Sequence, residues 1–461
     1  MTEIKNIYFI GIGGIGMSAL ALYFLEKGLR IAGYDKTETD LTRSLSVKGC
    51  DITYKDNTDS LPPVFRDPSA KRTILAIYTP AVPHDNAILS YFRNNGYTLQ
   101  KRSAVLGEIS RRAETVAVAG THGKTTVSTM IAHLLKQSHI GCSAFLGGIS
   151  KNYDSNYLPG QGRYTVMEAD EFDRSFHSLS PLIAVITSAD ADHLDIYGDR
   201  AAMIEAYREF CLKIRKKGKL LINSNITELI RIPEWINTST YGSTPGTDYR
   251  AENIKLHSGC YSFNLCTPSA TFYDIHFPFP GKINVENITA ASAVALICGV
   301  KEEELRNAIL KFEGVKRRFD IRVDMPGLTY IDDYAHHPEE IKACISSVRE
   351  YFSGRKITGI FQPHLYSRTR DHADGFAKAL DLLDEVILLP LYPAREEPIP
   401  GITSEVIFSK MKTGNKKMLS MDELPEALDL EKLSVLVTIG AGDIDRLVKP
   451  IEDKLKSRRR A

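Results

Sequence analysis

The segment 115–136 restricts the fold of this chain more than any other segment. Residues 115–119 are small and apolar, as in a buried strand, and residues 127–136 follow a helical pattern. Between them lies GTHGKTT, with the last apolar residues of the strand directly before it. A strand, a glycine loop and a helix in this order predict an α/β sheet whose loop receives phosphate. Val118 stands where the first glycine of the full Walker pattern would be.

The residues of this loop suit the binding of a nucleoside triphosphate. Glycines let backbone N–H groups approach phosphate oxygens, and the helix adds its positive end. Lys124 can reach the terminal phosphates, and the Thr125 hydroxyl can bind Mg²⁺. The alternative is a glycine-rich turn with a surface lysine, and we favour the phosphate site. The predicted nucleotide-binding residues here are Gly120, Thr121, His122, Gly123, Lys124, Thr125 and Thr126.

A second glycine loop lies near the N-terminus. The sequence GIGGIG follows a predicted strand at 6–10, and Asp35 follows the next strand at 30–33. Its candidate binding residues are Gly11, Gly13, Gly14 and Gly16. The pattern G-x-G-x-x-G alone is a weak dinucleotide fingerprint. We rank three interpretations: the diphosphate of a nucleotide sugar first, a structural turn second, and NAD or FAD third.

Length and apolar periodicity predict several α/β domains. At 461 residues the chain exceeds what one core accommodates, and we expect three domains, at 1–107, 108–314 and 315–461. Strands alternating with helices predict parallel, doubly wound sheets. The region 232–280 is richer in Thr, Ser, Tyr, Gly and Pro and predicts a small antiparallel patch. Strands are further expected at 51–54, 73–78, 97–99, 163–167, 182–187, 219–223, 329–331, 356–361, 386–389 and 435–439.

Composition argues against several classes of partner. The net charge of +1 predicts no broad basic face for nucleic acid and no basic stripe for a membrane surface. The seven cysteines are scattered without a C-x-x-C pair, as in a cytoplasmic protein with reduced thiols. We find no signal-peptide pattern and no apolar run of about 18 residues, and so expect no membrane insertion. We expect a monomer or a weak homodimer.

Two acidic clusters follow two predicted strands of the middle region. Glu168, Asp170, Glu171 and Asp173 lie in EADEFD, and Asp190, Asp192 and Asp195 lie with His193 in DADHLD. In a parallel sheet both clusters reach the edge that carries the phosphate loop. Carboxylates beside a triphosphate suit Mg²⁺. The alternatives are helix N-terminal charge for the carboxylates and, for His193, a hydrogen-bonded loop histidine, which spacing alone favours.

Further polar side chains begin helices or follow strands. Asn284 and Asn287 can pair with adenine or cap a helix, and capping is locally favoured. Arg318, with Arg317, can bind phosphate or face water. Asp333 and His336 can hold an ammonium group or serve as turn and cap residues. Arg368 suits a substrate carboxylate.

These pieces, in this order, resemble the Mur ligases of peptidoglycan synthesis. The resemblance covers nearly the whole chain: GIGGIGMSALA, GTHGKTT, EADEFDRSF, ADADHLDIYG, GKINVEN, GVKRRFD, DDYAHHP and FQPHLYSRT. It implies a Rossmann-like N-terminal domain for a UDP-sugar, a central ATPase domain of the P-loop type, and a Rossmann-like C-terminal domain for an amino acid. The implied reaction joins L-alanine to the lactyl carboxylate of UDP-N-acetylmuramate and converts ATP to ADP and phosphate.

The resemblance also implies roles for single residues. It assigns Lys124 and Thr125 to ATP and Mg²⁺, with Mn²⁺ as an alternative ion, and Glu168 and His193 to the metal. It places Asn284 and Asn287 at the adenine, and Arg318 and Asp333 at nucleotide-contacting, domain-closing positions. His336 and Arg368 fall where the amino acid and the reacting carboxylate are handled.

Three other functions stay open at this point. A murein-peptide recycling ligase would attach a tripeptide to the same nucleotide sugar, although FQPHLYSRT argues against it. An NAD-dependent oxidoreductase would use the first loop but leaves GTHGKTT and both acidic clusters without a role. A non-catalytic nucleotide-binding scaffold is the third.

Overall fold

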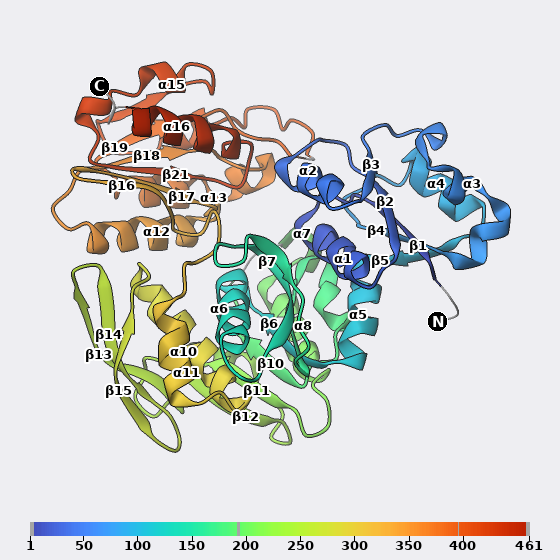
Figure 1. Cartoon of the computed structure of the whole chain (residues 1–461). Helices are drawn as coiled ribbons and strands as arrows, with labels where there is room; N and C mark the ends of the chain where they lie inside the picture. Colours follow the sequence, from blue (N-terminus) through green and yellow to red (C-terminus); the bar gives the residue numbers. More distant parts are fainter. Residues whose placement is uncertain (1–3, 191–193, 395, 458–461) are drawn as a thin grey trace. The chain divides into compact units, whose positions relative to one another are not determined.

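The computed structural model describes residues 4–190, 194–394 and 396–457. It forms two compact units. One comprises the chain up to Glu252 with Asn264–Ile275 and Glu286–Phe312, and the other comprises Asn253–Phe263, His276–Val285 and the chain from Glu313 onward. The structure contains three sheets (Figure 1), whereas the domain boundaries 1–107, 108–314 and 315–461 stay a prediction.

The first sheet is parallel throughout and has the order β3-β2-β1-β4-β5. Its central strand is the apolar run predicted at 6–10, and the GIGGIG loop connects this strand to α1. The strands are β1 (Asn6–Ile10), β2 (Arg30–Tyr34), β3 (Asp51–Thr53), β4 (Ile74–Tyr78) and β5 (Thr98–Lys101). The helices are α1 (Ile15–Glu26), α2 (Asp40–Val47), α3 (Pro63–Arg66), α4 (Ala87–Asn94) and α5 (Arg102–Arg112), with 3₁₀ turns at Thr58–Ser60 and Pro68–Thr73.

The middle sheet has ten strands in the order β15-β14-β13-β12-β11-β10-β6-β9-β7-β8. Its strands are β6 (Glu114–Ala119), β7 (Cys142–Ser150), β8 (Ser155–Leu158), β9 (Tyr164–Glu168), β10 (Ile183–Ile186), β11 (Lys219–Asn223), β12 (Asn237–Gly242), β13 (Tyr249–His257), β14 (Cys260–Cys266) and β15 (Thr271–Phe277). The helices are α6 (Lys124–Lys136), α7 (Leu194–Tyr197), α8 (Arg200–Cys211), α9 (Thr227–Ile230), α10 (Lys282–Ile297) and α11 (Glu302–Leu310), with 3₁₀ turns at Phe172–Ser178 and Ser224–Ile226.

The region 232–280 forms strands β12 to β15, as its changed composition predicts. Ser258 and Gly259 alone connect β13 to β14, and both have positive φ angles, of 47° and 75°. A two-residue connection of this geometry is the usual turn of an antiparallel hairpin. β12 departs from the expected pattern, because it pairs in parallel with both β11 and β13.

The third sheet has the order β16-β17-β21-β18-β19-β20 and lies in the second unit. Neighbouring strands of this sheet pair in parallel except β16 and β17, which form an antiparallel edge. The strands are β16 (Asp320–Met325), β17 (Leu328–Asp333), β18 (Ile357–Phe361), β19 (Glu385–Leu388), β20 (Lys416–Met418) and β21 (Val435–Ile439). The helices are α12 (Pro338–Tyr351), α13 (Tyr366–Leu380), α14 (Glu405–Phe408), α15 (Leu424–Ala427) and α16 (Asp445–Ser457), with a 3₁₀ turn at Leu430–Lys432.

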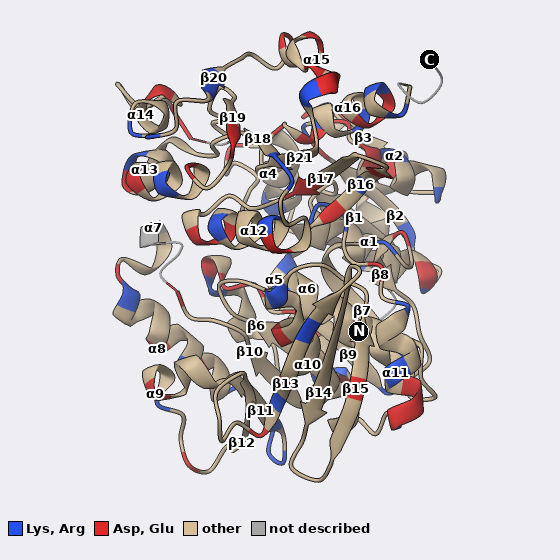
Figure 2. Ribbon diagram, turned by 90° about the vertical axis from the view of Figure 1, so that its left-hand side faces the viewer, with Lys and Arg blue, Asp and Glu red and all other residues tan. Residues whose placement is uncertain are grey.

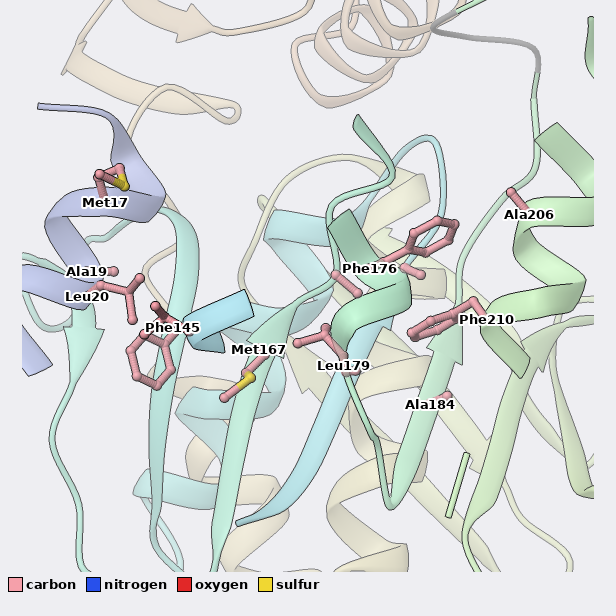
Figure 3. Packing of buried hydrophobic residues seen from close by; sticks show 14 of the residues in the cluster. Met17, Ala19, Leu20, Phe145, Met167, Phe176, Leu179, Ala184, Ala206 and Phe210 are labelled. Atoms are coloured by element: carbon pink, nitrogen blue, oxygen red, sulfur yellow. The ribbon is translucent and has the colours of Figure 1, made fainter. Parts of the chain in front are cut away.

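One hydrophobic cluster joins the first and middle sheets within the first unit (Figure 3). Met17 and Leu20 of α1 belong to the same buried cluster as Phe145 of β7 and Met167 of β9. The ring centroids of Tyr23 and Phe145 lie 5.4 Å apart. Since burial of aromatic side chains contributes strongly to packing, α1 is held on the edge of the middle sheet, and the two glycine loops belong to one packed unit.

Charged residues of both signs occur on helices of the second unit. Figure 2 shows Lys and Arg interspersed with Asp and Glu on α12 and α13. None of the helices in the described part of the chain has the length and hydropathy that a membrane crossing needs. All seven cysteines are described, and each is a free thiol.

Candidate active site

Three neighbouring parallel strands bring the phosphate loop and both acidic clusters to one edge of the middle sheet. β6 lies between β9 and β10 and pairs in parallel with each. The phosphate loop follows β6, the EADEFD segment begins at the last residue of β9, and the DADHLD segment follows β10. The predicted meeting of the phosphate loop, the first acidic cluster and Asp190 at the carboxyl edge is therefore confirmed, while residues 191–193 lie outside the described part of the chain.

The backbone of the phosphate loop requires its glycines. Gly120 and Gly123 have φ angles of 132° and 81°, which side-chain-bearing residues rarely adopt. A Cβ atom at Gly123 would lie 3.2 Å from Oδ1 of Asn287. Asn287 of α10 is thus packed against the start of α6, beside the amides that would receive phosphate.

Lys124 is folded back onto its own loop and onto one carboxylate. Its Nζ donates to the carbonyl oxygens of Gly120 at 2.7 Å and Thr121 at 3.1 Å, and to Oε1 of Glu171 at 2.8 Å. Burial raises the pKa of Glu171 to about 7, although Lys124 opposes this shift. Burial works against a charged Lys124, but Glu171 and Glu168 outweigh it and raise the pKa of the lysine. The loop therefore holds a charged ammonium group that can form charge-assisted hydrogen bonds with a bound anion.

The segment that follows β10 also contacts the phosphate loop. The Thr121 hydroxyl donates to the carbonyl oxygen of Asp190 at 2.9 Å, and the His122 amide donates to Oγ of Ser188 at 2.8 Å. His193, Asp192 and the side chain of Asp195 lie outside the described residues. Among the residues that the structure describes, no three His, Cys, Asp or Glu side chains form a ready metal site.

Two side chains near the loop have the oxygen chemistry that Mg²⁺ prefers. Glu168 ends β9, and its Oε2 accepts a hydrogen bond from the amide of Gly147 at 3.0 Å. Thr125 lies in the first turn of α6 and is 7% exposed. Carboxylate and hydroxyl oxygens fit Mg²⁺, which completes its shell with phosphate oxygens and water.

The two asparagines of α10 have different local roles. The Asn284 side-chain amide donates to the carbonyl oxygen of Pro280 at 2.7 Å, and its backbone amide donates to Gly281. Asn284 thus fastens the segment before the helix, in line with the structural alternative. Oδ1 of Asn287 instead lies beside the phosphate loop, where a Cβ atom at Gly123 would meet it.

The first glycine loop is closely packed on two sides. The Gly13 amide donates to Oδ2 of Asp35 at 2.7 Å, so the acid after β2 holds the loop itself. A Cβ atom at Gly16 would collide with the guanidinium of Arg102, which lies at the start of α5. Sequence reasoning missed Arg102, since only the fold brings the start of α5 to this loop.

In the second unit, Asp333 organises the loop after β17. Its Oδ2 accepts from the Phe319 amide at 2.7 Å, and its Oδ1 accepts from the Ala335 amide at 2.8 Å. Burial raises the pKa of Asp333 to about 6, while Arg318 and these amides oppose the rise. The Arg318 guanidinium lies 5.0 Å from the ring centroid of Tyr334. Asp333 therefore fixes the backbone that presents Arg318 and the following histidine.

His336 is oriented by that loop and is held neutral. Its Nδ1 lies 3.0 Å from the carbonyl oxygen of Tyr334, which places the proton on Nδ1 and leaves Nε2 as an acceptor. Burial lowers the pKa of His336 to about 4, with Glu340 opposing and Arg368 adding to the shift. Arg368, in the first turn of α13, is close enough to His336 to influence its charge.

Comparison with known proteins agrees with this arrangement of three sheets and two glycine loops. Residues 6–114 match the catalytic domain model of the Mur ligase family, residues 118–295 match the Mur ligase middle domain, and residues 317–442 match the glutamate ligase domain of Mur ligases. The chain belongs to the Mur ligase family.

Relatives of this Mur ligase match over nearly their whole length. The UDP-N-acetylmuramate–L-alanine ligase of Parabacteroides distasonis is 49% identical over 456 residues, covering 99% of this chain and 98% of the relative. The ligase of the same name from Porphyromonas gingivalis is 47% identical over 456 residues, with 98% and 99% covered.

Solved structures show the same fold. The UDP-N-acetylmuramate-alanine ligase MurC from Thermotoga maritima superposes with a TM-score of 0.84 at 28% identity, covering 98% of this chain and 99% of that one. A murein peptide ligase from Psychrobacter arcticus superposes with a TM-score of 0.72 at 21% identity, with 98% of each chain covered, and its likeness extends to the fold alone.

The neutral His336 of this Mur ligase predicts a dependence of stability on pH. An unfolded histidine takes up a proton near pH 6.5, whereas the folded protein resists protonation of His336 down to about pH 4. The His336 contribution to the free energy of unfolding is therefore present above pH 6.5 and falls as the pH drops from 6.5 to 4, by on the order of 3 kcal/mol.

Urea unfolding of the wild type and the His336→Gln variant at pH 4, 5, 6 and 7 measures this contribution. We expect the free energy of unfolding of the wild type to fall relative to that of the variant as the pH drops. The exposed His84→Gln change serves as the control and should leave the difference constant. A constant difference for His336→Gln as well would contradict the assignment of a buried neutral imidazole.

Proposed function

We propose that this chain joins L-alanine to the lactyl carboxylate of UDP-N-acetylmuramate and converts ATP to ADP and phosphate. The observation that carries the proposal is the charged Lys124 at the edge where β6, β9 and β10 end. Relatives at 47–49% identity bear the name of this ligase, which supports alanine as the amino acid and peptidoglycan precursor synthesis as the process.

The first step transfers phosphate to an acid. A lactyl carboxylate oxygen attacks the γ-phosphorus of ATP, the bond from phosphorus to the β–γ bridging oxygen breaks, and ADP leaves. Lys124 exchanges Glu171 for the terminal phosphate oxygens and neutralises their charge. Thr125, Glu168 and His193 would hold Mg²⁺, which when bound supplies further positive charge beside the phosphates.

The second step forms the amide bond. The amine of alanine attacks the carbonyl carbon of the acyl phosphate, and inorganic phosphate leaves. Nε2 of His336 is the acceptor that the loop leaves open for a proton of the amine. Burial, to which the charge of Arg368 adds, lowers the pKa of His336 to about 4 and makes it a weak base. We propose that a substrate carboxylate bound to Arg368 offsets the part of this shift that Arg368 causes.

A phosphate-release assay with ATP, Mg²⁺ and UDP-N-acetylmuramate tests the proposed function. We expect rapid release with L-alanine and slower or no release with glycine, serine or a murein tripeptide. Preference for the tripeptide would favour the recycling ligase, and absence of turnover with every amino acid would favour a nucleotide-binding scaffold. Binding of NAD in place of UDP-N-acetylmuramate would favour the oxidoreductase.

The cellular location follows from the proposed substrates, whereas the oligomeric state needs its own measurement. ATP and a UDP-linked sugar are substrates of the cytoplasm, where we therefore place the protein. The expected monomer or weak homodimer is measured by sedimentation of the purified chain with and without substrates.

A further inference from the structure

Three acidic residues in the segment after β9 pair with three cations. Oδ2 of Asp170 accepts from Nη2 of Arg102 at 3.1 Å, Asp173 pairs with Lys101, and Glu171 accepts from Lys124 at 2.8 Å. Lys101 ends β5 of the first sheet and Arg102 begins α5, whereas Lys124 belongs to the phosphate loop. One short segment therefore connects two parts of the molecule that bind separate ligands in the proposed function.

The segment is a fixed turn in an unfavourable backbone conformation. Asp173 and Arg174 have φ angles of 54° and 52°, in the left-handed region that non-glycine residues avoid. The Arg174 amide donates to the carbonyl oxygen of Glu171 at 2.9 Å, and the Tyr197 hydroxyl donates to the same oxygen at 2.6 Å. These contacts hold the strained turn with the Glu171 carboxylate directed at Lys124.

Arg102 contacts the first glycine loop as well as this turn. Its guanidinium occupies the space beside Gly16, where a side chain would collide with it. Gly16 lies in the first turn of α1, two residues after Gly14 at the N-cap. The Arg102 side chain is 20% exposed and that of Asp170 is 38% exposed, so water and ligands can reach the pair.

We propose that Arg102 couples the first glycine loop to the phosphate loop. The proposal rests on the proposed function, in which the diphosphate of the nucleotide sugar binds at Gly11–Gly16. A diphosphate offers more negative charge than one carboxylate and draws Arg102 away from Asp170. The strained turn then loosens, Glu171 releases Lys124, and the lysine becomes available to the γ-phosphate. Because coupling between two binding sites is reciprocal, ATP tightens the binding of the nucleotide sugar by the same factor.

Calorimetric titrations measure this coupling. UDP-N-acetylmuramate and the ATP analogue AMP-PNP with Mg²⁺ are each titrated into the full-length protein, alone and with the other ligand present. For the wild type we expect each ligand to tighten the binding of the other by about fivefold, the lower end of common allosteric couplings.

Two variants separate coupling from a structural role, because they should change the affinity for UDP-N-acetylmuramate in opposite directions. Arg102→Gln is expected to weaken binding of UDP-N-acetylmuramate about tenfold and to abolish the coupling, since the cation is lost. Asp170→Asn removes the competing partner, so it should tighten binding of both ligands and also abolish the coupling. Arg208→Gln removes an exposed pair with Glu205 on α8 and should retain both the affinities and the coupling.

The outcomes are distinct. Absence of coupling in the wild type, or wild-type coupling in Arg102→Gln, would overturn the proposal. A purely structural ion pair would lower the melting temperature of both variants and leave their affinities unchanged, which would also overturn it. If Arg102→Gln does not fold, Arg102→Lys, which keeps the charge without the planar fork, should show reduced coupling, and full coupling there would contradict the role of Arg102. A wild type that binds AMP-PNP but not UDP-N-acetylmuramate would instead refute the proposed function.

Discussion

Replacing Lys124 by alanine should reduce ATP-dependent phosphate release by about 10³-fold or more. The ammonium group donates to Oε1 of Glu171 at 2.8 Å, and in the proposed reaction it neutralises the transferring phosphoryl group. Loss of one such electrostatic group typically costs about 10²–10³ in turnover, and more in phosphoryl transfer. Steady-state assays with UDP-N-acetylmuramate and L-alanine at saturation measure the loss.

The specificity of this effect depends on two controls. Lys136→Ala removes an equal charge from the other end of α6, where Nζ contacts the carbonyl oxygen of Pro159, and should retain most of the activity. Binding of UDP-N-acetylmuramate to the Lys124→Ala protein should stay within about twofold of the wild type, because the first glycine loop is unchanged. Normal turnover of the Lys124→Ala protein would refute the assignment of the phosphate loop.

Replacing Glu171 by glutamine should lower the free energy of unfolding by about 3 kcal/mol in the absence of nucleotide, since breaking a buried ion pair leaves one charge uncompensated. Both partners are well covered, with side-chain exposures of 2% for Glu171 and 14% for Lys124. Phosphate can restore a partner to Lys124, so AMP-PNP with Mg²⁺ should raise the melting temperature of the variant more than that of the wild type.

Thermal melts with and without AMP-PNP measure both effects. Glu205→Gln on the exposed face of α8 is the matched control, and it should change neither the melting temperature nor the gain from nucleotide. A Glu171→Gln protein with the melting temperature of the wild type would contradict the exchange of Glu171 for phosphate. A rise in melting temperature with AMP-PNP that is smaller than that of the wild type would contradict it as well.

The sequence predicts the strands that carry the site better than the strands at the edges. The runs at 6–10, 219–223 and 435–439 coincide with β1, β11 and β21, because buried parallel strands are continuous apolar segments. β7 was missed, since Gly147 and Gly148 interrupt its apolar run near the edge of the sheet. β16, the antiparallel edge of the third sheet, carries charged residues and was also missed.

The residues of the site can be predicted from the sequence where a motif lies at the end of a predicted strand. Lys124, Glu168 and Asp190 lie at or after the carboxyl ends of β6, β9 and β10, and these three strands are neighbours in the parallel sheet. The roles of Glu171 and Arg102 depend on tertiary contacts between elements, to which no sequence spacing points. Position 193, predicted to bind the metal, lies outside the described residues.

Oxygen transfer from the substrate carboxylate to phosphate is the most direct measure of the proposed chemistry. UDP-N-acetylmuramate labelled with ¹⁸O in its lactyl carboxylate is turned over with ATP and L-alanine, and the released phosphate is analysed by mass spectrometry. Attack of the carboxylate on the γ-phosphorus predicts that one ¹⁸O atom appears in the phosphate formed in each turnover. Unlabelled phosphate accompanied by normal amide formation would show that the carboxylate never receives the phosphoryl group.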